Sequence, residues 1–441
     1  MAKSKTLIRL IGLLIFLLPL VAKAEMPIKP GDILNLEKCI EIATQRHPDI
    51  IAAFYKAEAN TSKVGQARAN YYPQLTGTYD YSRISSFGNS YPGGDLFSSI
   101  GGRGPFDQYS TGITLNQEIF NFGKTSTKVT IQKLNQESSQ FDLKNIIEEI
   151  VFNVRQCYYE LLKAKRNKEV GEEAVKQYQL HLKQAKGFYK VGTKPKFDVT
   201  KAEVDLSNSQ LNLIKLKNAL KIAQANLNNA MGIPEAPEYT IEDNLSFEKY
   251  EVSFEEALQK AYIHRPDLKS IIAQKKSAQA SIALAQKGYY PELTGNAAYN
   301  WSGKDFPLER RWNAGVGISL PIFNGFLTKY QIDEAQANLL VYQNNEESLK
   351  QKIFLEVQQS FLNLKAAEEA IPTAELTVKQ AEENLKIATG RYAAGVGNPI
   401  EVADAEVAFI NAKTNYNQAL CDYKVAIAAL EKAIGLGGSK K

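Results

Sequence analysis

The stretch Tyr71-Tyr72-Pro73-Gln74-Leu75-Thr76-Gly77 occurs a second time in this chain, as Tyr289-Tyr290-Pro291-Glu292-Leu293-Thr294-Gly295. The shift from Tyr71 to Tyr289 is 218 residues (289 − 71). Downstream, Ile119-Phe120-Asn121 returns as Ile322-Phe323-Asn324, and this shift is 203 residues (322 − 119). The chain is therefore an internal duplication. Its only net difference in length, 15 residues (218 − 203), falls in the loop between the two motifs.

Each motif opens or closes a segment in which apolar and polar residues alternate. Alternation predicts strands at about 73–83 and 109–119 in the first copy and at about 292–302 and 312–322 in the second. About ten residues with one apolar and one polar face is typical of a transmembrane β-strand, and aromatic residues cluster at both ends of these segments. A half-buried hairpin of a soluble sandwich would alternate in the same way. The aromatic girdles favour the membrane interpretation.

Long helical stretches follow each pair of strands. They are expected from Thr125 to about Lys190 and from Thr328 to about Thr389, with a break or kink at Pro372. Glycine-containing turns near 192–195 and 395–399 form the tips, and helices of about 35 residues return from them. Shorter helices precede the strands, and they would stack end to end with the returning helices. The expected fold is mainly α, with long helical hairpins and a small β part of four strands.

The expected domain organisation follows the duplication. Residues 1–24 have a charged start, an apolar core and an Ala22-Lys23-Ala24 cleavage site, which together indicate a signal peptide. The first repeat is expected at 25–232, a linker at 233–253, the second repeat at 254–435 and a short tail at 436–441. The formal net charge of +5 falls to about +1 on cleavage, because four basic residues leave with the signal. This small charge gives no reason to expect nucleic acid binding.

Neither the cysteines nor the histidines form a pattern that carries chemistry. The duplication places small or polar residues opposite each of the three cysteines, which predicts that Cys39, Cys157 and Cys421 are unpaired. The three histidines are far apart in sequence, and no hydrolase, metalloprotease or P-loop motif accompanies them. We therefore expect no enzymatic activity, no cofactor and no metal.

Four membrane strands cannot close a barrel within one chain. An open sheet edge in lipid would leave backbone groups unsatisfied at a cost of several kcal/mol each. Two chains would supply eight strands, which side chains nearly fill, and three would supply twelve, which leave a lumen. The polar faces are rich in Thr, Ser, Asn and Gly, and such small side chains favour the wider barrel.

The order of these motifs, repeated twice, resembles the TolC-like outer-membrane efflux proteins. The resemblance covers about Leu34 to Gly435. It implies a homotrimer whose twelve strands close a barrel in the lipid of the outer membrane and whose helices form a tunnel through the periplasm. It also implies an exit duct for drug efflux or type I protein secretion, which works with a periplasmic adaptor (membrane fusion) protein and an inner-membrane transporter. The alternative is a soluble periplasmic or surface coiled-coil protein without a pore.

The resemblance also implies functional positions at the two hairpin tips. Those expected to meet the adaptor are Gly192, Thr193, Gly395 and Gly397. Just past the second tip, Glu401 and Asp404 match acids that narrow the tunnel mouth, with Asp198 as the first-copy counterpart of Glu401. Lys201 stands opposite Asp404, so the acidic ring would come mainly from the second copy. The simpler alternative is that Glu401 caps a helix and Asp404 is a solvated surface acid.

Overall fold

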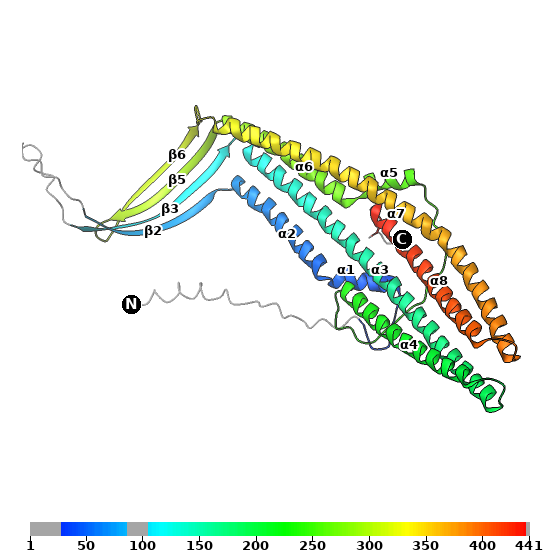
Figure 1. Cartoon of the computed structure of the whole chain (residues 1–441). Coiled ribbons are helices and arrows are strands. Elements are labelled where there is room, and N and C mark those ends of the chain that lie inside the picture. The colour runs from blue at the N-terminus through cyan, green and yellow to red at the C-terminus, as the bar shows by residue number, and fades with distance from the viewer. Residues whose placement is uncertain (1–27, 86–104, 438–441) are drawn as a thin grey trace, which may run out of the picture.

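The computed structural model describes residues 28–85 and 105–437. The expected signal peptide, residues 86–104 of the glycine-rich loop and the last four residues lie outside these ranges. The first half contains α1 (Leu36–Arg46), α2 (Pro48–Arg68), β2 (Gln74–Ile84), β3 (Phe106–Phe120), α3 (Lys124–Lys190) and α4 (Lys196–Ala230). The second half contains α5 (Phe254–His264), α6 (Pro266–Gln286), β5 (Glu292–Gly303), β6 (Glu309–Ser319), α7 (Leu327–Ala393) and α8 (Pro399–Ala433). The strands lie at one end of an elongated molecule and the hairpin tips at the other (Figure 1).

The four long strands form one antiparallel sheet in the order β2-β3-β5-β6. The pairing partner decides where each strand ends. β3 begins at Phe106, three residues before the prediction, because Phe106 pairs with Ile84 at the end of β2. β6 lies three residues earlier than predicted at both ends, because Glu309 pairs with Ser302 and Ser319 with Glu292. Pro321, just beyond β6, has no N–H to continue the ladder.

The helical part is mainly two hairpins that lie side by side. α3 packs against α2 and α4, which follow each other along its length, and α7 packs in the same way against α6 and α8. Contacts of α3 with α6 and α8 join the two halves. The expected four-helix antiparallel arrangement and the mainly α fold class are confirmed (Figure 1).

The expected break at Pro372 does not occur. α7 continues through this proline to Ala393, a length of 67 residues that equals the length of α3. A proline in a helix removes one hydrogen bond and crowds the preceding turn. Packing along α6 and α8 offsets that local cost, and Ile371 beside the proline is buried. Figure 1 shows α7 as one gently curved helix.

The main hydrophobic core lies where the short helices meet the long ones. The linker between the halves crosses this region, and its strand β4 (Thr240–Ile241) pairs in parallel with β1 (Ile33–Leu34). Two buried tyrosines fix the linker: the hydroxyl of Tyr158 on α3 donates to the carbonyl of Glu242 at 2.8 Å, and that of Tyr423 on α8 donates to the carbonyl of Glu248 at 2.7 Å. The linker thus ties the two hairpins together at mid-height.

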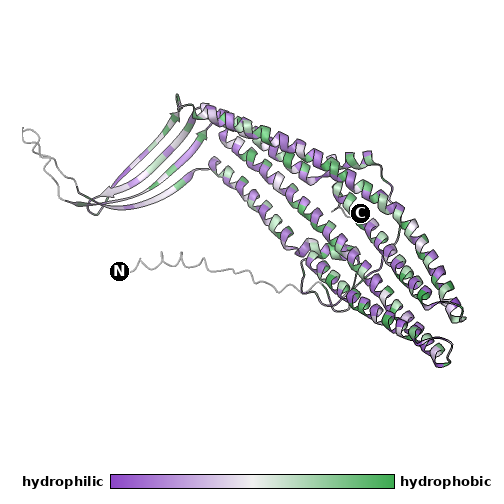
Figure 2. Ribbon diagram, in the orientation of Figure 1, coloured by the Kyte–Doolittle hydropathy of each residue, from purple (hydrophilic) through white to green (hydrophobic). Residues whose placement is uncertain are grey.

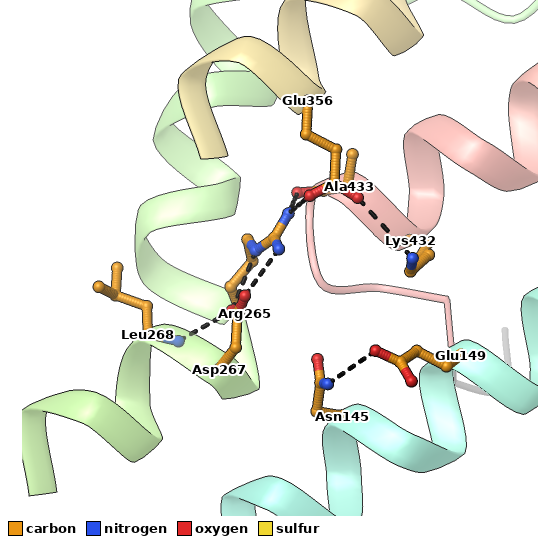
Figure 3. A network of polar contacts seen from close by, with 8 residues as sticks. All are labelled: Asn145, Glu149, Arg265, Asp267, Leu268, Glu356, Lys432 and Ala433. Carbon is orange, nitrogen blue, oxygen red and sulfur yellow. Dashed lines mark hydrogen bonds and ion pairs between the residues drawn. The ribbon is translucent and has the colours of Figure 1, made fainter. Parts of the chain in front are cut away.

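A buried arginine joins three helices in the second half (Figure 3). Arg265 donates two hydrogen bonds to Asp267, at 3.0 and 2.7 Å, in a bidentate pair. It also donates to Glu356 of α7 at 2.6 Å and to the carbonyl of Ala433 in α8 at 3.1 Å. The equivalent position in the first half is His47, which instead accepts a hydrogen bond from the amide of Asp49 and caps α2. The duplication therefore conserves the position of this junction and changes its chemistry.

The sheet exposes apolar side chains on its outer strands. Leu75, Tyr79, Trp312, Val316 and Ile318 are all more than half exposed in the single chain. The hydropathy colouring alternates along these strands (Figure 2). In residues 28–85 and 105–437, no helix has both the length and the hydropathy that a membrane span requires.

Candidate functional site at the hairpin tips

Each tip begins with a glycine in the left-handed conformation. Gly192 has φ +74° after α3, and Gly395 has φ +80° after α7. At the first tip, the amide of Gly192 donates to the carbonyl of Tyr189, and the amide of Thr193 donates to that of Phe188. The second tip repeats this pattern with Gly395 and Val396. These are Schellman motifs, which satisfy the last carbonyls of the helix while the chain reverses.

The four predicted tip residues have different exposures. Gly192, Thr193 and Gly395 are exposed at the surface of the turns, whereas Gly397 is buried. A Cβ at Gly397 would lie 2.6 Å from the amide nitrogen of Tyr392, so only glycine fits there. The Gly397 carbonyl accepts a hydrogen bond from the Lys194 ammonium at 3.2 Å, which links the two tips. Gly397 thus has a structural role, and the exposed tip surface comes from the other three residues.

Glu401 and Asp404 lie on the exposed face of the first turns of α8. Three residues apart, they are neighbours on one side of the helix. Glu401 is 4.0 Å from Arg391 at the end of α7, and both side chains are about half exposed. The N-cap of α8 is Asn398, whose side chain accepts from the amide of Ile400 at 3.0 Å. The capping role considered for Glu401 therefore belongs to Asn398.

Asp198 does not join this pair of acids. It is only 5% exposed, in the first turn of α4. Its charge acts on Tyr392 and His181, and it contributes to a raised pKa of the tyrosine. The duplication makes Asp198 and Glu401 equivalent in sequence, but the packing of the tips buries one and exposes the other.

A buried polar cluster fills the space between the hairpins just above the tips. The rings of His181 on α3 and Tyr392 on α7 lie 4.9 Å apart. In the described chain, three buried polar atoms of this region have no hydrogen-bond partner: His181 Nε2, the Tyr392 hydroxyl and Asp205 Oδ2. The other Asp205 oxygen accepts from Lys201 at 2.5 Å. Buried polar groups without partners are costly, and they concentrate where a protein changes its contacts.

Burial shifts the acid–base equilibria of this cluster in opposite directions. Burial raises the pKa of Glu406 on α8 to about 7, and Lys413 opposes the shift only in part. Burial lowers the pKa of His181, while the charges of Asp205 and Asp198 oppose that change. Both residues are therefore held close to the neutral form, because the charged form of each would lose its hydration.

Sequence reasoning missed His181, Asp205, Tyr392 and Glu406 as members of one cluster. A signal exists for Tyr392, because the duplication pairs it with Tyr189 and the two side chains differ sharply in exposure, 0% against 48%. The sequence does not contain that difference. Elsewhere, Cys39, Cys157 and Cys421 are unpaired, as predicted. Across the described ranges, no group of three or more His, Cys, Asp or Glu side chains is placed to hold a metal ion.

Comparison with known proteins matches both halves of the chain. The model of the family described as outer membrane efflux protein matches residues 39–233 and 257–436. Outer membrane protein TolC of Vibrio cholerae is 22% identical over 415 residues, which cover 91% of this chain and 90% of that protein. The probable outer membrane lipoprotein SilC of Salmonella typhimurium is 23% identical over 402 residues, which cover 84% of this chain and 79% of that protein.

The fold is shared with solved outer-membrane channels. The crystal structure of the Campylobacter jejuni CmeC outer membrane channel superimposes with a TM-score of 0.78 at 19% identity. The superposition covers 92% of this chain and 87% of that one. Nearly the whole described chain, strands and hairpins together, therefore has the architecture of such a channel.

Proposed function

This chain belongs to the outer membrane efflux protein family, and we propose that three copies of it close into one continuous conduit. It is an outer-membrane exit duct for efflux and not an enzyme; the soluble coiled-coil alternative is not favoured. The proposal adds a twelve-stranded barrel in the outer-membrane lipid, continued by a helical tunnel in the periplasm. A periplasmic adaptor and an inner-membrane transporter would complete the export system.

The unpaired edges of the sheet carry this proposal. Within the described residues, β2 and β6 each pair with a neighbouring strand on one side only. Both strands carry exposed apolar side chains, so their free edges would face lipid rather than water. An open edge in lipid is too costly to persist, and pairing β6 of one copy with β2 of the next removes it. Three copies give twelve strands and leave a lumen, whereas two copies give a nearly filled barrel.

The native mass of the detergent-extracted protein tests the assembly. We expect three chains per particle and stepwise conductance after insertion into planar lipid bilayers. A monomer or dimer without conductance would contradict the proposal. Extraction from membranes without detergent would contradict it as well.

We assign the constriction of the tunnel mouth to Glu401 and Asp404. Both carboxylates are exposed on one face of α8 at its tip end, and a ring of copies would gather them around one axis. Rings of carboxylates attract cations and raise the local cation concentration. Asp198 takes no direct part, because it is buried between helices.

Neutralising both acids tests this assignment. The double variant E401Q/D404N should lose much of its cation preference in single-channel recordings, measured as a shift of the reversal potential in a salt gradient. E251Q is the matched control, because Glu251 is an exposed acid on the linker, far along the chain from the tips. An unchanged reversal potential in the double variant would remove the acids from the constriction.

We also assign the adaptor contact to the exposed part of the tips, namely Gly192, Thr193 and Gly395. A photo-crosslinking amino acid at position 193 should capture the adaptor in intact cells. The same group at Glu251 on the linker serves as the control position. Equal capture at both positions, or none at the tip, would contradict the assignment.

A further inference from the structure

The duplication is obeyed by the pairing of the strands and not only by the sequence. In the first half, Gln74 pairs with Asn116 and Leu75 with Leu115. Shifting the first member of each pair by 218 residues and the second by 203 gives Glu292 with Ser319 and Leu293 with Ile318. Both of these pairs are present in the second half. The two shifts therefore convert one set of contacts into another.

The same shifts can be applied to the contact between the two halves. We define the intrachain seam as the contact of β3 and α3 with β5, α6 and α8. Its shifted counterpart is a contact of β6 and α7 with β2, α2 and α4. A single chain cannot form this contact along its length, because these elements lie at its opposite edges. Only a neighbouring copy can supply it, and we call it the interchain seam.

We propose that neighbouring copies associate through this interchain seam, which repeats the intrachain geometry and replaces its charged and polar contacts by apolar ones. The inference rests on the proposed ring of copies. It adds which residues meet across the ring and why they attract each other.

The charged contacts are the first to change. Among the described residues, three ion pairs cross the intrachain seam: Lys124 with Glu292 at 2.6 Å, Arg155 with Glu431, and Glu173 with Lys413 at 3.0 Å. The shifts convert these pairs into Leu327 with Gln74, Gln358 with Asn228, and Leu376 with Gln210. None of the six counterparts carries a charge.

The uncharged hydrogen bonds change in the same direction. Asn417 donates to Asn167 at 2.9 Å across the intrachain seam, and the counterparts are Ile214 and Ala370. The Ser138 and Ser270 hydroxyls lie 2.9 Å apart, and the counterparts are Val341 and Ala52. In the single chain, Leu376 is 54% exposed, Ile214 is 64% exposed, and Ala52 is exposed as well. The residues that replace polar contacts are thus the ones left uncovered.

The sheet supports the same register. Across the intrachain seam, Leu115 pairs with Ala297 and Ile113 pairs with Tyr299. The shifts predict that Ile318 of one copy pairs with Tyr79 of the next, and that Val316 pairs with Tyr81. These four side chains are among the exposed large apolar residues of the chain. Cross-strand pairs of aromatic and β-branched residues stabilise a sheet, so this register places favourable partners opposite each other.

The difference in chemistry has a physical cause. The two halves of one chain are held together by the linker, so their seam needs little free energy of its own and can be polar. Two separate copies lose translational and rotational freedom on association, and burial of apolar surface must offset that loss. The change in chemistry also keeps an intrachain seam from being exchanged for an interchain seam.

Cysteine cross-linking tests the register. In a chain with C39A, C157S and C421A, the pair A370C and I214C should react with a short bismaleimide to give covalent dimers and trimers on a denaturing gel. The matched control is N167C with N417C, which occupies the equivalent positions of the intrachain seam and should give no increase in mass. Each single cysteine alone should also give no ladder.

The outcomes separate the two proposals. A protein that is monomeric before cross-linking overturns the proposed assembly itself. A trimer that cross-links through I214C with A366C or A374C, one helical turn away, but not with A370C, overturns the interchain seam and leaves the assembly intact.

Transplanting an intrachain ion pair gives a second test. L376E should convert most of the trimer to smaller species, because it places a charge against an apolar neighbour. Adding Q210K should restore the trimer, because the two residues would then reproduce the pair of Glu173 and Lys413 between copies. Loss of the trimer in L376E without recovery in the double variant would contradict the seam. Circular dichroism of each variant verifies that the chain remains helical.

Discussion

Replacement of Glu406 by glutamine is expected to stabilise the packed tip at high pH and to have no effect at low pH. Glu406 is buried on α8, and burial raises its pKa from 4.5 to about 7. When the tip opens locally, the carboxyl regains water and titrates near its ordinary value. The packed tip therefore has its full stability below pH 4.5 and loses stability as the pH rises from 4.5 to 7.

The size of the effect follows from the shift. A shift of about 2.5 pKa units (7 − 4.5) corresponds to roughly 3.4 kcal/mol at about 1.36 kcal/mol per unit. Residual solvent screening reduces this value, so we expect about 2–3 kcal/mol at pH 8. Glutamine has the same shape and no charge, so E406Q should remove this penalty.

Hydrogen–deuterium exchange of the first turns of α8 measures the free energy of local opening. After correction for the intrinsic effect of pH, exchange at pH 8 should be roughly 30- to 150-fold slower in E406Q than in the unmodified protein. At pH 4.5 the two should exchange at the same rate. E401Q is the matched control, because Glu401 is an exposed acid on the same helix. Equal exchange of E406Q and the unmodified protein at pH 8 would refute the reasoning, as would a comparable slowing in E401Q.

Three further changes have expected outcomes. R265M should lower stability by about 3 kcal/mol, seen as a lower midpoint of thermal unfolding in detergent, because it leaves two acids and a carbonyl without their partner; an unchanged midpoint would contradict this role. G397A should destabilise the second tip and open it to proteolysis, whereas G390A, in a helix with open space around it, should be neutral or slightly stabilising; equal proteolysis of both variants would disprove the packing argument. H181F should raise stability by about 1–3 kcal/mol, because it removes a buried nitrogen without a partner, and a lower unfolding midpoint would count against that reasoning.

Local pattern was enough to predict most of the architecture, because the relevant interactions are close in sequence. Alternation over about ten residues indicates a strand whatever it packs against, and an uninterrupted helical period indicates a helix. The glycines at 192 and 395 mark the tips because a chain reversal after a helix requires a left-handed residue. The duplication located both copies of each feature without any structural information.

Local pattern failed where a neighbouring element decided the outcome. Pro372 predicts a break, but packing along α6 and α8 keeps α7 continuous. The register with β5, rather than the strand's own alternation, determines where β6 begins and ends. These are long-range effects, and a proline or a strand end cannot be judged without its partners.

The sequence by itself determined that this chain is a duplicated helical and β protein with glycine turns at equivalent places. Only the tertiary structure decided that Asp198 is buried while its counterpart Glu401 is exposed. It also decided that His181 and Tyr392, more than two hundred residues apart, share one buried cluster. The physical reason is that periodicity depends on neighbours along the chain, whereas burial and charge depend on which helices meet across the tips. That meeting breaks the symmetry of the two copies, since each half packs against a different partner.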